Sequence, residues 1–354
     1  MPRSFLSICA VILISGCTGN SAAPRISAGG ATFVNPLMQK WSGEYRAKKG
    51  VEIDYVSKGS GYGIEQFTAK TIDFGCSDAP MKKEQLETAR AKGGEVVHIP
   101  LILGAVAVIY NVPEVSAAPL KLTGEVLADV YARKIRKWND ERIAALNPGV
   151  PLPDRDIVVV ARAESSGTTN IFTEYLSKAS PAFRSEIGPG TKPKWPQGVV
   201  PQEQNDGVAG FVKNNPGTIG YVEVLFARKN SLPVATLRNR AGEWVLPSAA
   251  AATAAADAAM SKPPTEEPYS LHVLTFSLTD ADGPQAYPIC GISYAVTYLR
   301  LPKDKSATIL DFLTWAVTDG QSLGVDLEYA PLPKSLQEKV LVRLRAIRGE
   351  STAN

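Results

Sequence analysis

Residues 157–170 read IVVVARAESSGTTN, and this stretch decides the fold class and the position of the site. It begins with a run of β-branched residues, which predicts a buried strand. The run ends in a turn of serine, glycine and threonine. Apolar residues then recur at helical spacing at Ile171, Phe172, Tyr175 and Leu176. The stretch therefore predicts a strand, a polar turn and the start of a helix.

This turn has the residue types of an anion site. The first N–H groups of a helix have no partner inside the helix, the positive end of its dipole lies there, and hydroxyl groups add donors. Arg162 adds a planar fork of charged donors that fits a tetrahedral oxyanion. An ordinary helix cap, with Arg162 paired to Glu164, would leave the same residues in the sequence. Other segments of the sequence are needed to distinguish an anion site from an ordinary helix cap.

Three earlier segments repeat parts of this pattern. Residues 26–33 and 51–63 each predict a strand that runs into a glycine-rich turn and a helix, and residues 71–80 predict a short strand whose final turn carries Asp78. Strands that alternate with helices indicate an α/β fold with parallel or mixed sheets. Ligands in such folds bind beyond the carboxyl ends of the strands. Three helix starts and one carboxylate can therefore meet at a single anion.

Four further segments carry expectations that the structure tests. Residues 96–112 predict two apolar strands separated by Gly104, and residues 181–201, rich in glycine and proline, predict an irregular surface segment. Asn205-Asp206-Gly207 is typical of a helix cap. Residues 248–260 are almost all alanine and predict a helix, to which the sequence gives no function.

Residues 1–16 predict a secretory signal peptide. Arg3 provides the positive start, and the apolar run of residues 5–14 is too short to span a bilayer. The run ends Leu-Ile-Ser-Gly-Cys at residues 13–17, which resembles a bacterial lipobox. That resemblance implies cleavage before Cys17, lipidation of this cysteine and a tether over residues 17–24. A plain secretory signal with an incidental cysteine is the alternative.

Composition is that of a soluble globular protein. The chain has 354 residues, enough for two domains with cores of their own, with 44% hydrophobic and 21% charged residues. The formal net charge is only +3 and no lysine- or arginine-rich block occurs, which argues against a nucleic-acid partner. After the leader, no apolar run reaches transmembrane length.

Cysteine and histidine are sparse. Beyond Cys9 in the leader and Cys17, only Cys76 and Cys290 remain. In an oxidising compartment these two can pair, and two buried free thiols are the alternative. The chain has two histidines, His98 and His272, and no metal-ligand spacing. A zinc site or a histidine-dependent catalytic triad therefore has little support.

An ordered set of short motifs resembles one family over nearly the whole chain after the leader. Each motif is weak alone, but the order is specific. The motifs are residues 29–33 (GGATF), 59–61 (GSG), 73–80 (DFGCSDAP), 135–140 (IRKWND), 162–169 (RAESSGTT), 194–196 (KWP), 205–207 (NDG), 216–223 (PGTIGYVE) and 329–333 (YAPLP). The chain thereby resembles the PstS family, the phosphate-binding subunits of phosphate ABC transporters.

The resemblance implies a two-lobed α/β fold of the periplasmic-binding-protein type (type II). Mixed central sheets would be flanked by helices, and the ligand would lie in the cleft between the lobes. The implied first lobe comprises residues 25–104 and 288–354, and the second comprises residues 105–287.

The resemblance also implies which residues bind the ligand. The expected phosphate-binding residues are Thr32, Phe33, Ser60 and Asp78 from the first lobe and Arg162, Ser166, Gly167 and Thr168 from the second. Glu164 replaces the family's commoner aspartate two residues after the arginine, and it either supports Arg162 or touches the ligand. Cys76 and Cys290 stand where small or hydroxyl residues are expected, near the same lobe.

The function that the resemblance implies is binding of inorganic phosphate and delivery to an ABC permease, without chemical turnover and without a cofactor. Expected partners are two permease proteins and two ATPase subunits. The protein would be a monomer on the periplasmic side of the cell envelope, anchored to a membrane through Cys17. Three alternatives stay open: a sensing or adhesion role, another tetrahedral oxyanion, and a phosphatase with Ser166 or Thr168 as nucleophile. The phosphatase lacks a histidine base or metal cluster.

The residues favour phosphate on physical grounds as well. Phosphate near neutral pH keeps at least one O–H group, which can donate to a carboxylate such as Asp78. Sulfate has no such proton and would face an unpaired acceptor and a like charge. An unpaired buried polar group costs about 1–3 kcal/mol. A carboxylate in an anion site therefore selects phosphate over sulfate.

Overall fold

The computed structural model describes residues 23–115, 119–262, 269 and 273–349. The predicted signal peptide, the lipidation site at Cys17 and most of the tether lie outside these residues. His272 also lies outside them.

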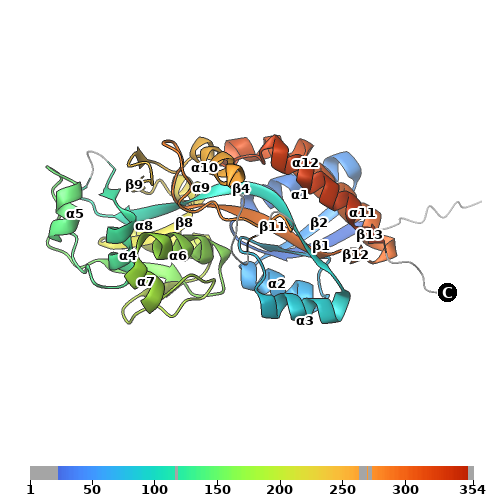
Figure 1. Cartoon of the computed structure of the whole chain (residues 1–354), viewed down its shortest axis with the longest axis horizontal. Coiled ribbons are helices and arrows are strands. Elements are labelled where there is room, and N and C mark those ends of the chain that lie inside the picture. Colours follow the sequence, from blue (N-terminus) through green and yellow to red (C-terminus); the bar gives the residue numbers. More distant parts are fainter. Residues whose placement is uncertain (1–22, 116–118, 263–268, 270–272, 350–354) are drawn as a thin grey trace, which may run out of the picture.

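The fold is built on one mixed sheet of eight strands in the order β2-β1-β3-β11-β4-β8-β6-β7 (Figure 1). The strands are β1 (Arg25–Gly30), β2 (Glu52–Ser57), β3 (Phe74–Ser77), β4 (Val96–Asn111), β6 (Val158–Arg162), β7 (Val200–Gln202), β8 (Thr218–Glu223) and β11 (Cys290–Tyr298). Two small sheets are formed by β5 (Lys121–Leu122), β9 (Thr236–Arg238) and β10 (Trp244–Val245), and by β12 (Arg300–Leu301) and β13 (Arg348–Gly349).

Helices flank this sheet at both ends of the elongated molecule (Figure 1). The part built on β1, β2 and β3 is here called the first lobe. It carries α1 (Asn35–Lys49), α2 (Ser60–Thr68), α3 (Lys83–Gly93), α11 (Lys303–Val317), the 3-10 helix η1 (Asp319–Leu327) and α12 (Lys334–Ala346). The part built on β6, β7 and β8 is the second lobe. It carries α4 (Gly124–Tyr131), α5 (Glu141–Leu146), α6 (Gly167–Ala179), α7 (Pro181–Glu186), α8 (Gln204–Asn214), α9 (Val224–Lys229) and α10 (Ala249–Ser261).

The two lobes share the sheet because β4 runs through both of them. Residues 96–105 pair with β11, and residues 106–111 pair with β8. The prediction of two strands separated by Gly104 is therefore wrong. Gly104 pairs with Gly291 within the strand, and a side chain there would collide with the Phe33 ring, which lies 2.7 Å from where a Cβ atom would be. Because β4 is buried along nearly its whole length, its sequence is largely apolar and does not show whether it forms one strand or two.

Strand direction brings the two lobes face to face. β3 and β4 are both antiparallel to β11, so they run the same way, and β8 is antiparallel to β4. β1 and β2 run parallel with β3, while β6 and β7 run parallel with β8. The carboxyl ends of the two groups of strands therefore point toward each other across the middle of the molecule. This is where ligands bind in α/β sheets.

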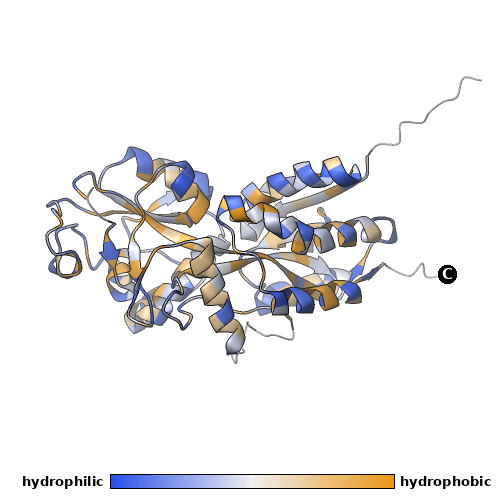
Figure 2. Cartoon of the chain, turned by 90° about the horizontal axis from the view of Figure 1, so that it is seen from above, coloured by the Kyte–Doolittle hydropathy of each residue, from blue (hydrophilic) through white to orange (hydrophobic). Residues whose placement is uncertain are grey.

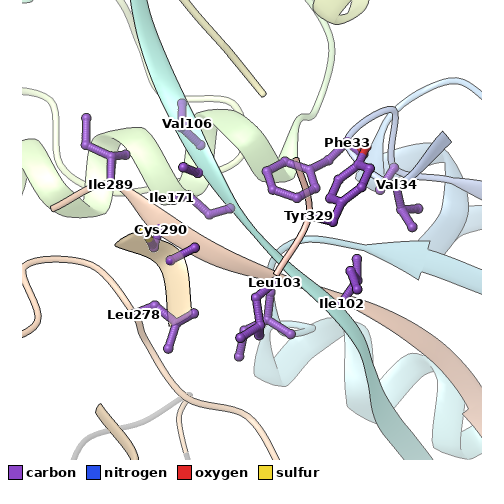
Figure 3. Close-up of a cluster of buried hydrophobic side chains, with 14 of the residues drawn as sticks. Phe33, Val34, Ile102, Leu103, Val106, Ile171, Leu278, Ile289, Cys290 and Tyr329 are labelled. Atoms are coloured by element: carbon purple, nitrogen blue, oxygen red, sulfur yellow. The ribbon is translucent and has the colours of Figure 1, made fainter. Parts of the chain in front are cut away.

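A continuous hydrophobic core lies along the crossing strands. Figure 3 shows Phe33 and Tyr329 next to each other on one side of β4, Ile171 and Ile289 on the other, and Val106 on β4 itself, all at buried positions. Figure 2 shows the same segregation over the whole molecule, with hydrophilic residues concentrated on the outer helices and hydrophobic ones along the strands. The core thus extends through the junction instead of ending at each lobe.

The two remaining cysteines do not pair. Both thiols are buried and free. Cys76 lies opposite Ala295 in the sheet, five residues along β11 from Cys290. At about 3.3 Å per residue this separates the two cysteines by roughly 16 Å, whereas a disulfide requires Cα atoms within about 7 Å. The disulfide considered from the sequence is therefore contradicted, and the alternative of two buried thiols holds.

Two other expectations need correction. The segment 181–201 is not wholly irregular, because it contains α7 and the start of β7. The alanine-rich helix α10 forms as predicted, with Ser248 as its cap, and it packs with Ala252 and Ala255 fully buried, close to β4. None of the helices in the described residues combines the length and hydropathy needed to cross a bilayer.

Candidate anion site between the lobes

Three turns of the first lobe present polar side chains at the carboxyl ends of its strands. Thr32 follows β1, Ser60 opens α2 after β2, and Asp78 follows β3. All three residues are less than 5% exposed. Gly59 allows the second of these turns, because its φ of 97° is one that residues with a side chain rarely adopt. The Asp78 N–H donates to Ser60 Oγ at 3.2 Å, so two of these turns are in direct contact, while Thr32 is joined to the second lobe.

The second lobe contributes residues 157–170, whose sequence predicts an anion site. Arg162 is the last residue of β6, and α6 starts at Gly167 with Ser166 as its cap. The Ser166 hydroxyl accepts the backbone N–H of Thr169 at 3.2 Å. Arg162, Ser166 and Thr168 are each at most 4% exposed. The predicted strand, turn and helix start are therefore all present.

Direct hydrogen bonds join the two sets of turns. The Gly167 N–H donates to Ser60 Oγ at 3.0 Å, and Arg162 Nη2 donates to Thr32 Oγ1 at 3.1 Å. At the rim the Gly61 N–H donates to the Ser165 carbonyl at 3.0 Å. Residues more than 100 positions apart in the chain thus lie within one polar cluster.

Burial raises the pKa of Asp78 from its ordinary value to about 7. The Ser293 hydroxyl, which donates to Oδ1 at 2.8 Å, the charge of Arg162 and the Ser60 hydroxyl all oppose this rise. The carboxyl group is consequently poised between its acid and ionised forms near neutral pH. Below pH 7 it can donate a proton in a hydrogen bond, and above pH 7 it can only accept one.

Arg162 is held in place by Glu164. The two side chains form an ion pair in which Nε lies 2.9 Å from Oε1, while Nη1 lies 3.4 Å from the Thr168 hydroxyl. The Arg162 side chain is only 1% exposed, so the guanidinium has one orientation. Glu164 also accepts the backbone N–H of Gln204 at 3.2 Å. Glu164 thus links Arg162 to the start of α8.

Phe33 differs from the other expected ligand residues because its side chain serves the core. The ring is fully buried, 6.1 Å between centroids from Tyr329 (Figure 3), and the Tyr329 hydroxyl donates to the Phe33 carbonyl. Any ligand contact of Phe33 must therefore come from its backbone N–H group.

Two polar residues of this cluster, Asn205 and Ser293, were not predicted from the sequence as part of the site. Asn205, expected to cap a helix, is the second residue of α8 and donates to Thr32 Oγ1 at 2.9 Å, while Glu203 takes the cap position without a side-chain bond. Ser293 lies in β11, which the sequence predicts only as an apolar strand, and its hydroxyl donates to Asp78 Oδ1. The available signal for Ser293 was a serine within a mostly apolar strand sequence, where a buried hydroxyl needs a partner.

The arrangement is rich in neutral donors and has one carboxyl group, that of Asp78, which accepts from Ser293 and forms no ion pair with a described residue. Hydroxyl groups, backbone N–H groups and one guanidinium surround the Asp78 carboxyl, and the Arg162 charge is balanced by Glu164. Such a site can hold a compact oxyanion that itself carries a proton. Within the residues that the structure describes, no three histidine, cysteine, aspartate or glutamate side chains gather closely enough to hold a metal ion.

Comparisons with known proteins show which family the chain resembles. A family model for the PBP superfamily domain matches residues 17–320. The chain is similar to the phosphate-binding protein PstS of Pasteurella multocida, at 39% identity over 330 residues that cover 93% of this chain and 92% of that protein. It is similar to PstS of Methanocaldococcus jannaschii at 36% identity, with 88% and 85% covered.

Solved structures share the fold. The chain superimposes on PfluDING, a high-affinity periplasmic phosphate-binding protein bound with phosphate, with a TM-score of 0.70 at 21% identity, covering 90% of this chain and 93% of that one. A phosphate-binding protein from Stenotrophomonas maltophilia gives a TM-score of 0.66 at 20% identity, with the same coverage. The prediction of a two-lobed α/β binding-protein fold is confirmed, with one sheet common to both lobes.

Proposed function

The chain belongs to the PBP superfamily and, within it, to the PstS phosphate-binding proteins, and on this premise we propose that its interlobe site binds inorganic phosphate. The protein would then deliver phosphate to an ABC permease without changing it chemically. The relatives compared above are named as phosphate-binding proteins.

The observation that carries this proposal is the buried carboxyl of Asp78 among donors. Phosphate keeps an O–H group near neutral pH and satisfies the ionised carboxylate, whereas sulfate cannot. The remaining phosphate oxygens need donors, which Thr32, the Ser60 backbone N–H, Arg162 and the α6 start supply, while the Ser60 hydroxyl donates to Asp78.

We propose that the ligand is bound by the residues expected from the sequence. These are Thr32, the Phe33 N–H, Ser60, Asp78, Arg162, Ser166, Gly167 and Thr168. Glu164 acts through Arg162 and does not touch the ligand, because its carboxylate already accepts from the guanidinium and from the Gln204 N–H.

Phosphate would bind by closure of two lobes with the boundaries 25–104 plus 288–354 and 105–287. The switch of β4 from β11 to β8 after Ala105 supports this division. Opening would break the bonds that Gly167 and Arg162 make across the cleft. The hinge would then lie in the crossing strands and in the segment before β11.

The cell-envelope role adds three further proposals. The protein would be a periplasmic monomer, Cys17 would carry a lipid anchor, and the partner would comprise two permease proteins and two ATPase subunits. The lipobox-like sequence before Cys17 and the PstS relatives support them.

Calorimetric titration of the purified protein, freed of endogenous phosphate, tests the proposal. We expect one phosphate per chain and no competition from a large excess of sulfate. Sulfate binding as tight as phosphate binding at pH 8 would contradict the selectivity argument, and absence of phosphate binding would contradict the function itself.

Gly167→Ala should weaken phosphate binding about tenfold or more without unfolding either lobe. An added Cβ at this position would lie 2.5 Å from Ser60 Oγ and 2.8 Å from the Asp78 backbone nitrogen, both in the other lobe. The methyl group therefore obstructs closure, and a loss of about 1.4 kcal/mol corresponds to tenfold in affinity.

Gly43→Ala is the matched control for this prediction, since nothing lies within 4 Å of its Cβ position in α1. It should leave affinity unchanged and stabilise the helix by up to about 1 kcal/mol. Affinity and thermal unfolding of the free proteins would be measured together. An unchanged affinity in Gly167→Ala would rule out closure onto this turn.

A further inference from the structure

We infer that Asn205 is a positioning residue for phosphate: together with Arg162 it fills both acceptor positions of the Thr32 hydroxyl, so that the hydroxyl proton has to point to the ligand. This inference rests on the proposed function, because it specifies how one group of the interlobe site is oriented.

The orientation of the Asn205 amide is fixed by the backbone. Asn205 is fully buried, and its Oδ1 accepts the N–H of Glu223, at the end of β8, at 3.1 Å. A backbone N–H can only donate, so the atom that faces it must be the amide oxygen. The NH2 group of Asn205 therefore faces Thr32 Oγ1, 2.9 Å away, and donates to it.

Thr32 Oγ1 has to accept a second time from Arg162. A guanidinium has no acceptor, so the contact of 3.1 Å from Nη2 is also donated to the hydroxyl. A threonine hydroxyl accepts two hydrogen bonds and donates one. With both acceptor positions filled, only its proton is left, and no hydrogen bond within the described part of the chain takes up that proton.

Thr32 and Asp78 therefore have opposite hydrogen-bonding roles toward the ligand. Thr32 is restricted to donating, which suits an unprotonated phosphate oxygen, while the ionised Asp78 is restricted to accepting, which suits the protonated one. Thr32 belongs to the first lobe and both of its donors belong to the second lobe. The hydroxyl is therefore oriented only when the lobes meet, so closure itself completes the site.

The test is a set of phosphate titrations of the full protein at pH 8. Asn205→Ala should weaken binding about tenfold, because the Thr32 proton is no longer directed. Asn205→Asp should weaken it more, roughly 100-fold. Its carboxylate still accepts from Glu223 but takes the Thr32 proton away from phosphate and adds a like charge.

A double-mutant cycle separates positioning from structure. In Thr32→Val, which has no hydroxyl, Asn205→Ala should change affinity less than twofold, whereas in Thr32→Ser it should again cost about tenfold. Asn214→Ala, which removes an exposed asparagine from the same helix, is the control and should bind as the wild type does. Asn205→Ser has the same expected losses and replaces Asn205→Ala if that variant does not fold.

The outcomes separate this inference from the proposed function. Failure of the wild type to bind phosphate overturns the proposed function. If the wild type binds, an Asn205→Asp loss no greater than that of Asn205→Ala overturns the positioning role alone. So does an Asn205→Ala loss that persists in Thr32→Val.

Discussion

Arg162→Ala is expected to weaken phosphate binding by about 100- to 1,000-fold. Arg162 supplies the one charged donor group among the proposed ligand residues, and its side chain is 1% exposed. A hydrogen bond between charged partners is worth about 1.5–3 kcal/mol, and Nη1 is the guanidinium nitrogen left to make it, because Nε and Nη2 donate to Glu164 and Thr32. The variant also loses the bond from Arg162 to Thr32 that joins the lobes.

Part of this loss should come from Glu164. Without its partner at Nε, the carboxylate stays near the anion and repels it. Arg162→Ala combined with Glu164→Gln should therefore bind more tightly than Arg162→Ala alone. Arg162→Lys should be intermediate, because it keeps the charge and loses the planar fork.

Arg142→Ala is the control for this series. Arg142 is 44% exposed and forms ion pairs with Asp129 and Asp140 on the surface. Exposed pairs contribute little, so phosphate affinity should not change. Calorimetry at pH 8 measures every variant. A phosphate affinity of Arg162→Ala within threefold of the wild type would exclude Arg162 from the ligand shell.

The sequence allowed the local elements around the site to be predicted because each of them is a continuous segment. The strand before Arg162, the turn and the helix at Gly167 follow from side-chain periodicity and capping, which depend on near neighbours. The convergence of the turns at Thr32, Ser60 and Asp78 followed from a general rule about the ends of strands.

Long-range pairing could not be predicted in the same way. β4 is one continuous strand whose first half pairs with β11 and whose second half pairs with β8. The apolar sequence around Gly104 does not reveal this change of partner strand. The same limit applies to the cysteines, since the register of β3 against β11 separates Cys76 from Cys290. Both facts depend on residues that are distant in the sequence.

Asn205 shows a different limit of sequence analysis. Asparagine before a helical pattern is a good cap, and that local interpretation accounts for Asn205-Asp206-Gly207 without reference to the site. In the structure its side chain makes contacts on either side, with Glu223 and with Thr32. Such a residue is found only when the donors and acceptors of the folded protein are counted.

Asp78→Asn is expected to remove most of the discrimination between phosphate and sulfate. An asparagine side chain offers an NH2 donor to a sulfate oxygen, where the ionised carboxylate offers only an acceptor and a like charge. Sulfate affinity should rise at least 100-fold at pH 9. Phosphate should bind more weakly than to the wild type, because it loses a charged acceptor for its O–H group. Asp54→Asn, an exposed carboxylate on β2, is the control.

The pKa of Asp78 determines whether sulfate affinity rises or falls with pH. Burial raises the pKa of Asp78 to about 7, so in the free protein the carboxyl is mostly protonated at pH 6 and mostly ionised at pH 8. Sulfate needs the protonated form, which can donate to it. Its affinity for the wild type should therefore be nearly constant below pH 6 and fall about tenfold per pH unit above pH 7.

Phosphate should not follow that course, because it retains an O–H group on both sides of neutrality and can pair with the ionised carboxylate. The ratio of phosphate to sulfate affinity in the wild type should thus grow with pH, while in Asp78→Asn it should stay nearly flat between pH 6 and pH 9. Competition titrations at four pH values measure the ratio directly. A ratio that rises equally in Asp78→Asn would assign the discrimination to a group other than Asp78. Because only a titrating acceptor at this position predicts different slopes for the two proteins, the slopes test the mechanism more sharply than either affinity alone.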